Sequence, residues 1–299
     1  MSGPPGASGA AVAPGGDGGI GAAPLLVLGA ILSVQIGAAT ATTLFDEIGP
    51  AGTVLFRLLF AALLLWAIWR PSLRGHPREA LSDAALFGVT LAGMNICFYM
   101  ALDRIPLGIA VTLEFVGPLA VALLASRRRL DLVWVGLAAT GILLLAGPAS
   151  SLDALGVVLA LTAGGFWGIY ILLAARVGRA FSGGRGLALA MVVAAALMVV
   201  PGVAAAGESL LSWHAVAVGA AVALLSSVIP YSLELESLRR LPVGVFGVLM
   251  SLEPAVAAAV GLVGLEQGLS ATEAAGIALV VAASVGVLRR PGAAAPTEA

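Results

Sequence analysis

The 299-residue sequence is 60% hydrophobic and 10% charged, with a net charge of −1 and a mean hydropathy of +1.08. A soluble globular protein carries roughly 25% charged residues, because water wets its surface. The composition therefore predicts a protein embedded in a lipid bilayer, with no basic surface for nucleic acid. The single cysteine, Cys97, excludes a disulfide framework or a cysteine-rich zinc site, and no metal or cofactor is expected.

The N-terminal residues 1–22 are rich in Gly, Ala and Pro and are predicted to form a flexible tail. They lack the positive region of a signal peptide, so the first hydrophobic run is expected to remain as a membrane span. Ten runs are long enough to cross a hydrocarbon core about 30 Å thick as helices. The predicted spans are 24–43, 51–69, 81–101, 106–125, 132–148, 154–175, 186–205, 213–234, 243–264 and 270–288.

The arginines indicate how these spans are oriented, because positively charged loops stay in the cytoplasm. Arg104 lies in a loop on one side, and Arg57 lies inside the second span. The other thirteen of the fifteen basic residues fall on the opposite side, after the even-numbered spans: Arg70, Arg74, Arg78, Arg127, Arg128, Arg129, Arg176, Arg179, Arg185, Arg239, Arg240, Arg289 and Arg290. Both termini, including a short tail at 291–299, are predicted to be cytoplasmic, with the breaks near Asp46, Asp153 and Glu208 outside.

The two halves of the chain share a spaced pattern. With a constant offset of 136 residues, Leu102, Pro106, Gly108, Leu113 and Pro118 recur as Leu238, Pro242, Gly244, Leu249 and Pro254. The repeating unit has five spans, and an odd number inserts the second copy in the opposite orientation. The predicted fold is therefore all-α, with two inverted five-helix repeats at 23–149 and 150–290. Inverted repeats are typical of secondary transporters, whose substrate site lies between the repeats near the midplane.

Charged residues inside a span cost at least about 2.5–3.5 kcal/mol each, which makes them candidates for function. Glu114 and Glu253 both lie near a proline, Pro118 and Pro254 respectively. Because proline has no N–H, each proline is expected to kink its helix and free the carbonyl four residues before it. The two carboxyl groups either bind substrate or a proton, or belong to ordinary kinks and pair with nearby backbone donors.

Arg57 and Glu234 are the other charged candidates. Arg57 either binds a substrate carboxylate, or snorkels to the interface, or pairs with an acid such as Asp46 or Glu47. Glu234 shares a helical face with Ser227 and Tyr231, or ends its span as a solvated charge at the cytoplasmic rim. The remaining polar and aromatic candidates for a substrate pathway are Gln35, Asn95, Tyr99, Trp167, Tyr170 and Tyr231.

Four stretches carry a resemblance to a known family: GMNICFYMAL (93–102), IPLGIAVTLEFVGPLAVALLASRR (105–128), GGFWGIYIL (164–172) and VIPYSLELESLRRLPVGVFGVLMSLEPA (228–255). From about residue 25 to 290 the chain resembles the bacterial threonine/homoserine exporters. These belong to the drug/metabolite transporter superfamily, whose repeat is called EamA. The resemblance implies export of threonine, homoserine and related small amino acids across the cytoplasmic (inner) membrane. A different cargo on the same scaffold, such as a drug or nucleobase, is the alternative.

The sequence argues against an enzyme. Intramembrane hydrolysis or transfer usually needs an activated nucleophile or a metal, and of the two histidines His76 falls in a cytoplasmic loop and His214 at the outer end of a span. No P-loop for direct use of ATP is present. A zwitterionic amino acid gains little from the membrane potential, so proton antiport is the expected drive. Glu114 is the first candidate for the proton carrier, because it lies deepest in its span, and no oligomeric state is predicted.

Overall fold

The computed structural model describes residues 23–72, 74–124, 131–146, 152–238, 240–241 and 243–288. These residues form an all-helical structure. The first half contains α1 (Ala23–Thr42), α2 (Phe45–Trp69), α3 (Arg78–Leu102), α4 (Leu107–Glu114), α5 (Val116–Leu124) and α6 (Asp131–Ala146). The second half contains α7 (Ala154–Ala180), α8 (Arg185–Ala206), the 3₁₀ turn η1 (Gly207–Leu211), α9 (Trp213–Ala223), the π turn η2 (Leu224–Val228), α10 (Ile229–Leu238), α11 (Val243–Met250), α12 (Glu253–Gly264) and α13 (Ala271–Leu288).

Within these residues, seven apolar helices are long enough to cross a membrane, and three shorter apolar stretches lie at Leu107–Val121, Leu132–Leu145 and Ala271–Gly286. The predicted runs are helical, but several bounds were wrong. The run predicted to end at residue 175 continues to Ala180. Asp46, predicted in a loop, lies on the first turn of α2, where a non-helical Gly49 (φ 67°) bends the chain before Pro50. The predictions at 1–22, 147–148 and 291–299 lie outside the described residues.

Two runs are interrupted near their prolines. Phe115 separates α4 from α5, three residues before Pro118. Ser251 and Leu252 separate α11 from α12, and Pro254 lies in the first turn of α12. The kink predicted at Pro254 is therefore a break between two helices. Proline favours the first turn of a helix because the N–H that it lacks would have no partner there.

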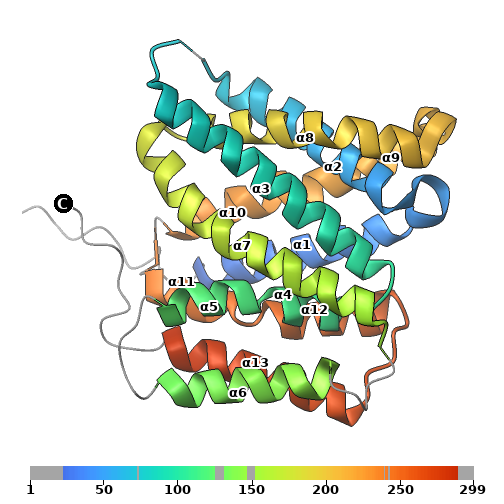
Figure 1. The fold of residues 1–299 in the computed structure, drawn as a ribbon, viewed down its shortest axis with the longest axis vertical. Coiled ribbons are helices and arrows are strands. Elements are labelled where there is room, and N and C mark those ends of the chain that lie inside the picture. Colours follow the sequence, from blue (N-terminus) through green and yellow to red (C-terminus); the bar gives the residue numbers. More distant parts are fainter. Residues whose placement is uncertain are drawn as a thin grey trace, which may run out of the picture.

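Helices from the two halves of the chain pack on each other (Figure 1). Helices α2 and α8 lie side by side at one edge, and α6 and α13 at the opposite edge. Between them α3 packs on α7, α1 on α10, and α4 on α12.

Glycine allows the closest of these contacts. A Cβ on Gly117 would lie 1.8 Å from the carbonyl oxygen of Gly164, and one on Gly108 would lie 2.5 Å from the Cα of Ala258. Such small residues let helix backbones approach closely in membranes. The first contact joins α5 to α7 next to the break at Phe115, and the second joins α4 to α12.

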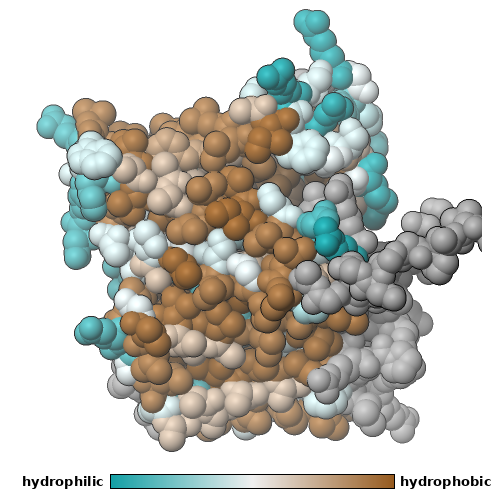
Figure 2. Space-filling view, turned by 180° about the vertical axis from the view of Figure 1, so that it is seen from behind, coloured by the Kyte–Doolittle hydropathy of each residue, from teal (hydrophilic) through white to brown (hydrophobic). Residues whose placement is uncertain are grey.

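The outer surface is apolar between the helix ends. Figure 2 shows hydrophobic side chains over most of one face, with hydrophilic ones toward its margins. Large hydrophobic side chains from many helices are exposed, among them Leu25, Leu63, Leu143, Val158, Leu172, Val200 and Val263. Exposure of such a surface to water would be energetically unfavourable, whereas contact with lipid tails is favourable. The arrangement fits a membrane protein.

Candidate substrate cavity

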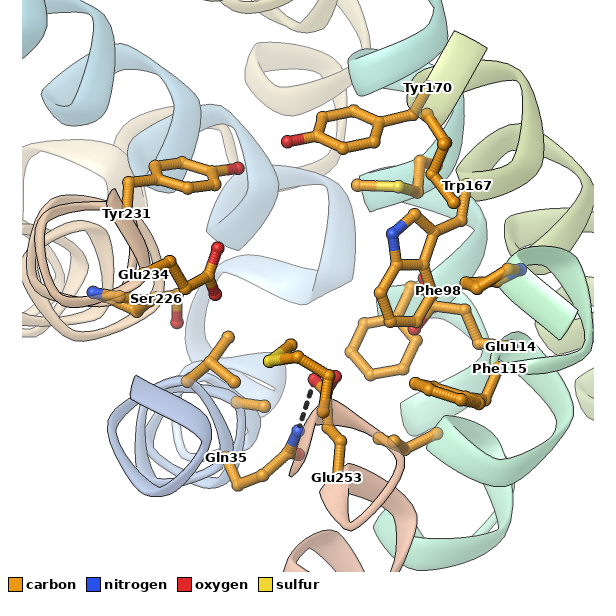
Figure 3. A pocket seen from close by; sticks show the side chains of 18 of the residues that line it. Gln35, Phe98, Glu114, Phe115, Trp167, Tyr170, Ser226, Tyr231, Glu234 and Glu253 are labelled. Atoms are coloured by element: carbon orange, nitrogen blue, oxygen red, sulfur yellow. Dashed lines mark hydrogen bonds between the residues drawn. The ribbon is translucent and has the colours of Figure 1, made fainter. Parts of the chain in front are cut away.

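A cavity of about 560 Å³ lies among the broken helices, with walls from both halves of the chain (Figure 3). Its lining comes from α1, α2, α3, α4, α5, α7, η2, α10, α11, α12 and α13. This volume is within the range of about 300–1,000 Å³ that small-molecule sites occupy. The polar side chains that line it come from both halves of the chain and from several helices.

Most of the residues predicted from the sequence lie together on this lining: Gln35, Arg57, Asn95, Glu114, Pro118, Trp167, Tyr170, Tyr231, Glu234 and Glu253. Two do not. Tyr99 is fully buried behind Arg57, and Pro254 is buried in the first turn of α12. Asn95 lines the cavity but donates its side-chain N–H to the carbonyl of Leu91 in its own helix, at 2.8 Å.

The carboxyl group of Glu253 meets the amide of Gln35 at the cavity wall, a contact drawn in Figure 3. Gln35 Nε2 donates to Glu253 Oε1 at 3.0 Å. Within the part of the chain that the structure describes, Glu253 Oε2 and Gln35 Oε1 are buried without a hydrogen-bond partner. An unsatisfied buried acceptor costs about 1–3 kcal/mol, so a proton or a ligand donor at this pair would be stabilising.

Arg57 is buried, with 8% of its surface exposed, and does not reach Asp46 or Glu47. Its guanidinium donates to Tyr99 Oη and to the carbonyl of Ser226, both at 3.2 Å, and lies 5.4 Å from the centre of the Tyr99 ring. Glu47 is instead 2.8 Å from His214. The interfacial pairing considered for Arg57 is therefore wrong.

A π turn in the α9–α10 segment supplies the acceptor for Arg57. Pro230 has no N–H to give to the carbonyl of Ser226, four residues earlier, so that carbonyl lacks its usual helical donor. Arg57 donates to it from α2. Ser33 Oγ donates to the neighbouring carbonyl of Leu225 at 2.8 Å. Side chains from two other helices thus satisfy the backbone groups that the turn leaves open.

Glu114 is buried at the end of α4 and lines the cavity. Its carbonyl, predicted to be freed by Pro118, faces the backbone of Gly164, where a Cβ would lie 2.5 Å from the carbonyl oxygen. Glu234 also lines the cavity and is partly buried, and Figure 3 shows its carboxyl group near Tyr231 and Ser226. The alternative of a solvated charge at the rim is therefore wrong for Glu234.

Aromatic and aliphatic side chains complete the walls. Phe115 and Trp167 pack edge to face, with ring centres 5.4 Å apart, and Phe87 packs on Tyr170 at 5.1 Å. Ala38, on the same predicted face as Gln35, and Met250, whose carbonyl Pro254 was expected to free, also line the cavity. The sequence did not single out the lining residues Val34, Met94, Phe98, Val111, Phe115, Leu119, Val121, Ile171, Pro230, Phe246, Gly247 and Ser284. Apolar residues fill every span, so nothing in the spacing of the apolar members of this list distinguishes their positions.

Ser226 was missed for a different reason. Regular α-helical spacing from Glu234 and Tyr231 points to Ser227, but the π turn holds one extra residue and shifts the face. Ser226 therefore lines the cavity, and Ser227 is buried away from it. Pro230 within a hydrophobic run was the available signal.

Comparison with known proteins shows the family to which the chain belongs. The family model of the EamA-like transporters matches residues 154–289. The threonine/homoserine exporter RhtA of Escherichia coli (strain K12) is 43% identical over 265 residues, which cover 88% of this chain and 90% of that protein. The chain belongs to the EamA-like transporter family. RhtA of Salmonella typhimurium (strain LT2) is 42% identical over the same shares. A protein of known crystal structure shares the fold, with a TM-score of 0.59 and 18% identity over 88% of this chain and 95% of its own.

Family membership confirms several predictions. The protein is a multi-pass transporter of the bacterial cytoplasmic membrane and not an enzyme, and the resemblance to the threonine/homoserine exporters is confirmed.

Neither histidine lines the cavity: His214 contacts Glu47, and His76 stacks on Phe181 with ring centres 4.5 Å apart. Among the described residues, no group of three His, Cys, Asp or Glu side chains is placed to hold a metal.

Proposed function

We propose that this EamA-like transporter exports threonine, homoserine and related small amino acids from the cytoplasm. The observation that carries the proposal is the 43% identity to the threonine/homoserine exporter over 88% of the chain. The cavity supports it chemically. A free amino acid needs groups for its carboxylate and its ammonium, and the lining provides one arginine and three glutamates between apolar walls.

The proposed topology has ten spans, with both termini in the cytoplasm. The three interrupted segments α4–α5, α9–η2–α10 and α11–α12 each count as one span. The repeats are residues 23–149 and 150–290, in opposite orientations, and the family match at 154–289 falls in the second. The packing of α2 on α8 and of α6 on α13 supports this symmetry, because each pair joins equivalent spans of the two repeats.

The proposed drive is antiport with protons. Zwitterionic threonine has no net charge, so export against a gradient needs a second flow. A carboxyl group in an apolar cavity can hold a proton in one state and the ammonium of the substrate in the other. Mutually exclusive occupancy of one group is enough to exchange the two. Glu114 is the first candidate, followed by Glu253 and Glu234, which line the same cavity.

Growth of cells that overproduce the protein tests the cargo. Such cells are expected to tolerate inhibitory homoserine or threonine and to accumulate less of either than cells with the empty vector. Unchanged sensitivity, together with gained resistance to a dye or a nucleobase analogue, would favour the alternative cargo.

A further inference from the structure

Arg57 carries a buried positive charge that no carboxylate of the described residues neutralises by an ion pair. Its two hydrogen bonds go to neutral acceptors, a tyrosine hydroxyl and a backbone carbonyl. A charge inside a membrane protein is costly, and such residues normally pair with a charge of opposite sign. The cavity has Glu114, Glu234 and Glu253 on other helices, yet Arg57 is not within bonding distance of them.

The guanidinium is also held in one orientation. The carbonyl of Ser226, which lacks a donor from Pro230, accepts from one guanidinium nitrogen, and Tyr99 Oη accepts from the other. The Tyr99 ring centre lies 5.4 Å from the guanidinium carbon. A guanidinium has five N–H donors, and two are used here. Nε has no partner. An oriented arginine with unused donors and no anion matches the planar fork by which arginine binds carboxylates.

We propose that Arg57 binds the carboxylate of the transported amino acid, which supplies the missing negative charge. This inference rests on the proposed function and specifies the class of substrate. The substrate must carry a free carboxylate, and its side chain contributes less to recognition. Amino alcohols and amides of the same size are expected to bind more weakly, because they carry no negative charge to pair with the arginine. The ammonium is then bound by carboxyl groups elsewhere on the cavity lining, with Glu253 and its Gln35 partner among them.

The test compares threonine with threoninol, which replaces the carboxylate by a CH₂OH group and keeps the ammonium and the side chain. Purified full-length protein in lipid nanodiscs is titrated with labelled threonine, and unlabelled threonine or threoninol is used as competitor. Wild-type protein is expected to prefer threonine by about tenfold or more, since charge-assisted hydrogen bonds are lost with threoninol. Arg57→Gln is expected to bring this ratio close to one.

Two further variants separate binding from folding. Arg57→Lys keeps the charge but not the fork, so its ratio should lie between those of the wild type and Arg57→Gln. Arg104→Gln makes the same change at an arginine outside the cavity, 3.8 Å from Asp153, and should leave the ratio unchanged. An Arg57→Gln protein that binds more weakly but keeps the full preference for threonine would overturn the inference, as would a wild-type ratio near one. Wild-type protein that binds neither compound would instead contradict the proposed function itself.

Discussion

The three carboxyl groups of the cavity differ in their immediate surroundings. Glu253 already has a donor in Gln35, at 3.0 Å, and Glu234 is only partly buried. Glu114 is 8% exposed, and among the described residues no side chain donates to it. A carboxyl group without a fixed partner can exchange a proton for a ligand ammonium at the lowest cost. This difference keeps Glu114 first among the candidates for the coupling residue.

Glu114→Gln is expected to abolish proton-driven export and to leave the protein folded and inserted. The amide has the shape of the protonated acid but cannot release a proton. Uptake of threonine by inside-out vesicles with an acidic lumen should fall to that of vesicles lacking the protein. Glu208→Gln, on the exposed turn η1, is the matched control and should keep full uptake. If Glu114→Gln still concentrates threonine in response to the pH gradient, Glu114 is not the carrier.

At the scale of elements, the helix breaks depend on glycines that admit a neighbouring backbone. Gly117, one residue into α5, meets Gly164 of α7 so closely that a Cβ would lie 1.8 Å from its carbonyl oxygen. Gly165, the next residue of α7, faces open space, and a Cβ added there would have no neighbouring atom within 4 Å. Gly117 and Gly165, on facing helices, therefore differ in their tolerance of a side chain.

Gly117→Ala is expected to lower the unfolding free energy by about 1–3 kcal/mol or more, because backbone atoms must move to make room. Gly165→Ala should be neutral or slightly stabilising, since alanine has the higher helix propensity. Thermal unfolding of the purified proteins in detergent measures both. Equal stability of the two variants would contradict the described contact between α5 and α7.

The π turn gives a second expectation at this scale. Pro230→Ala restores an N–H that can compete with Arg57 for the carbonyl of Ser226. Threonine binding should weaken, while stability stays the same or rises, because proline is a poor residue inside a helix. Pro201→Ala, on the exposed side of α8, is the control and should not affect binding. Weakened binding accompanied by an equal loss of stability would show that Pro230 acts on folding alone.

Prolines and charges in the sequence located much of this site. Pro118 and Pro254 marked where the runs are interrupted, and Arg57, Glu114 and Glu253 could be found because charges are rare in spans. The partners of Arg57 could not be found, since Ser226 and Tyr99 are 169 and 42 residues away from it in the chain. Contacts between distant helices depend on packing, which helical periodicity does not describe.

For the whole molecule, the orientation of the spans rests on the arginine distribution and remains a prediction. Asp46, Asp153 and Glu208 are exposed near helix ends, which makes them suitable for single cysteines in a Cys97→Ser background. All three are expected to react with an impermeant thiol reagent in intact cells. A cysteine at Arg127 should react only after the cells are permeabilised. Labelling of the cysteine at position 127 in intact cells would overturn both the topology and the inverted repeat.

Transport by inside-out membrane vesicles tests the central claim most directly. Their lumen corresponds to the outside of the cell, so export appears as uptake. Vesicles that contain the protein and have an acidic lumen are offered a panel of labelled amino acids, and control vesicles lack the protein. Threonine and homoserine are expected to accumulate in the lumen, and accumulation should stop when the pH gradient is collapsed. If neither amino acid enters faster than in control vesicles, the protein is not an exporter of these amino acids.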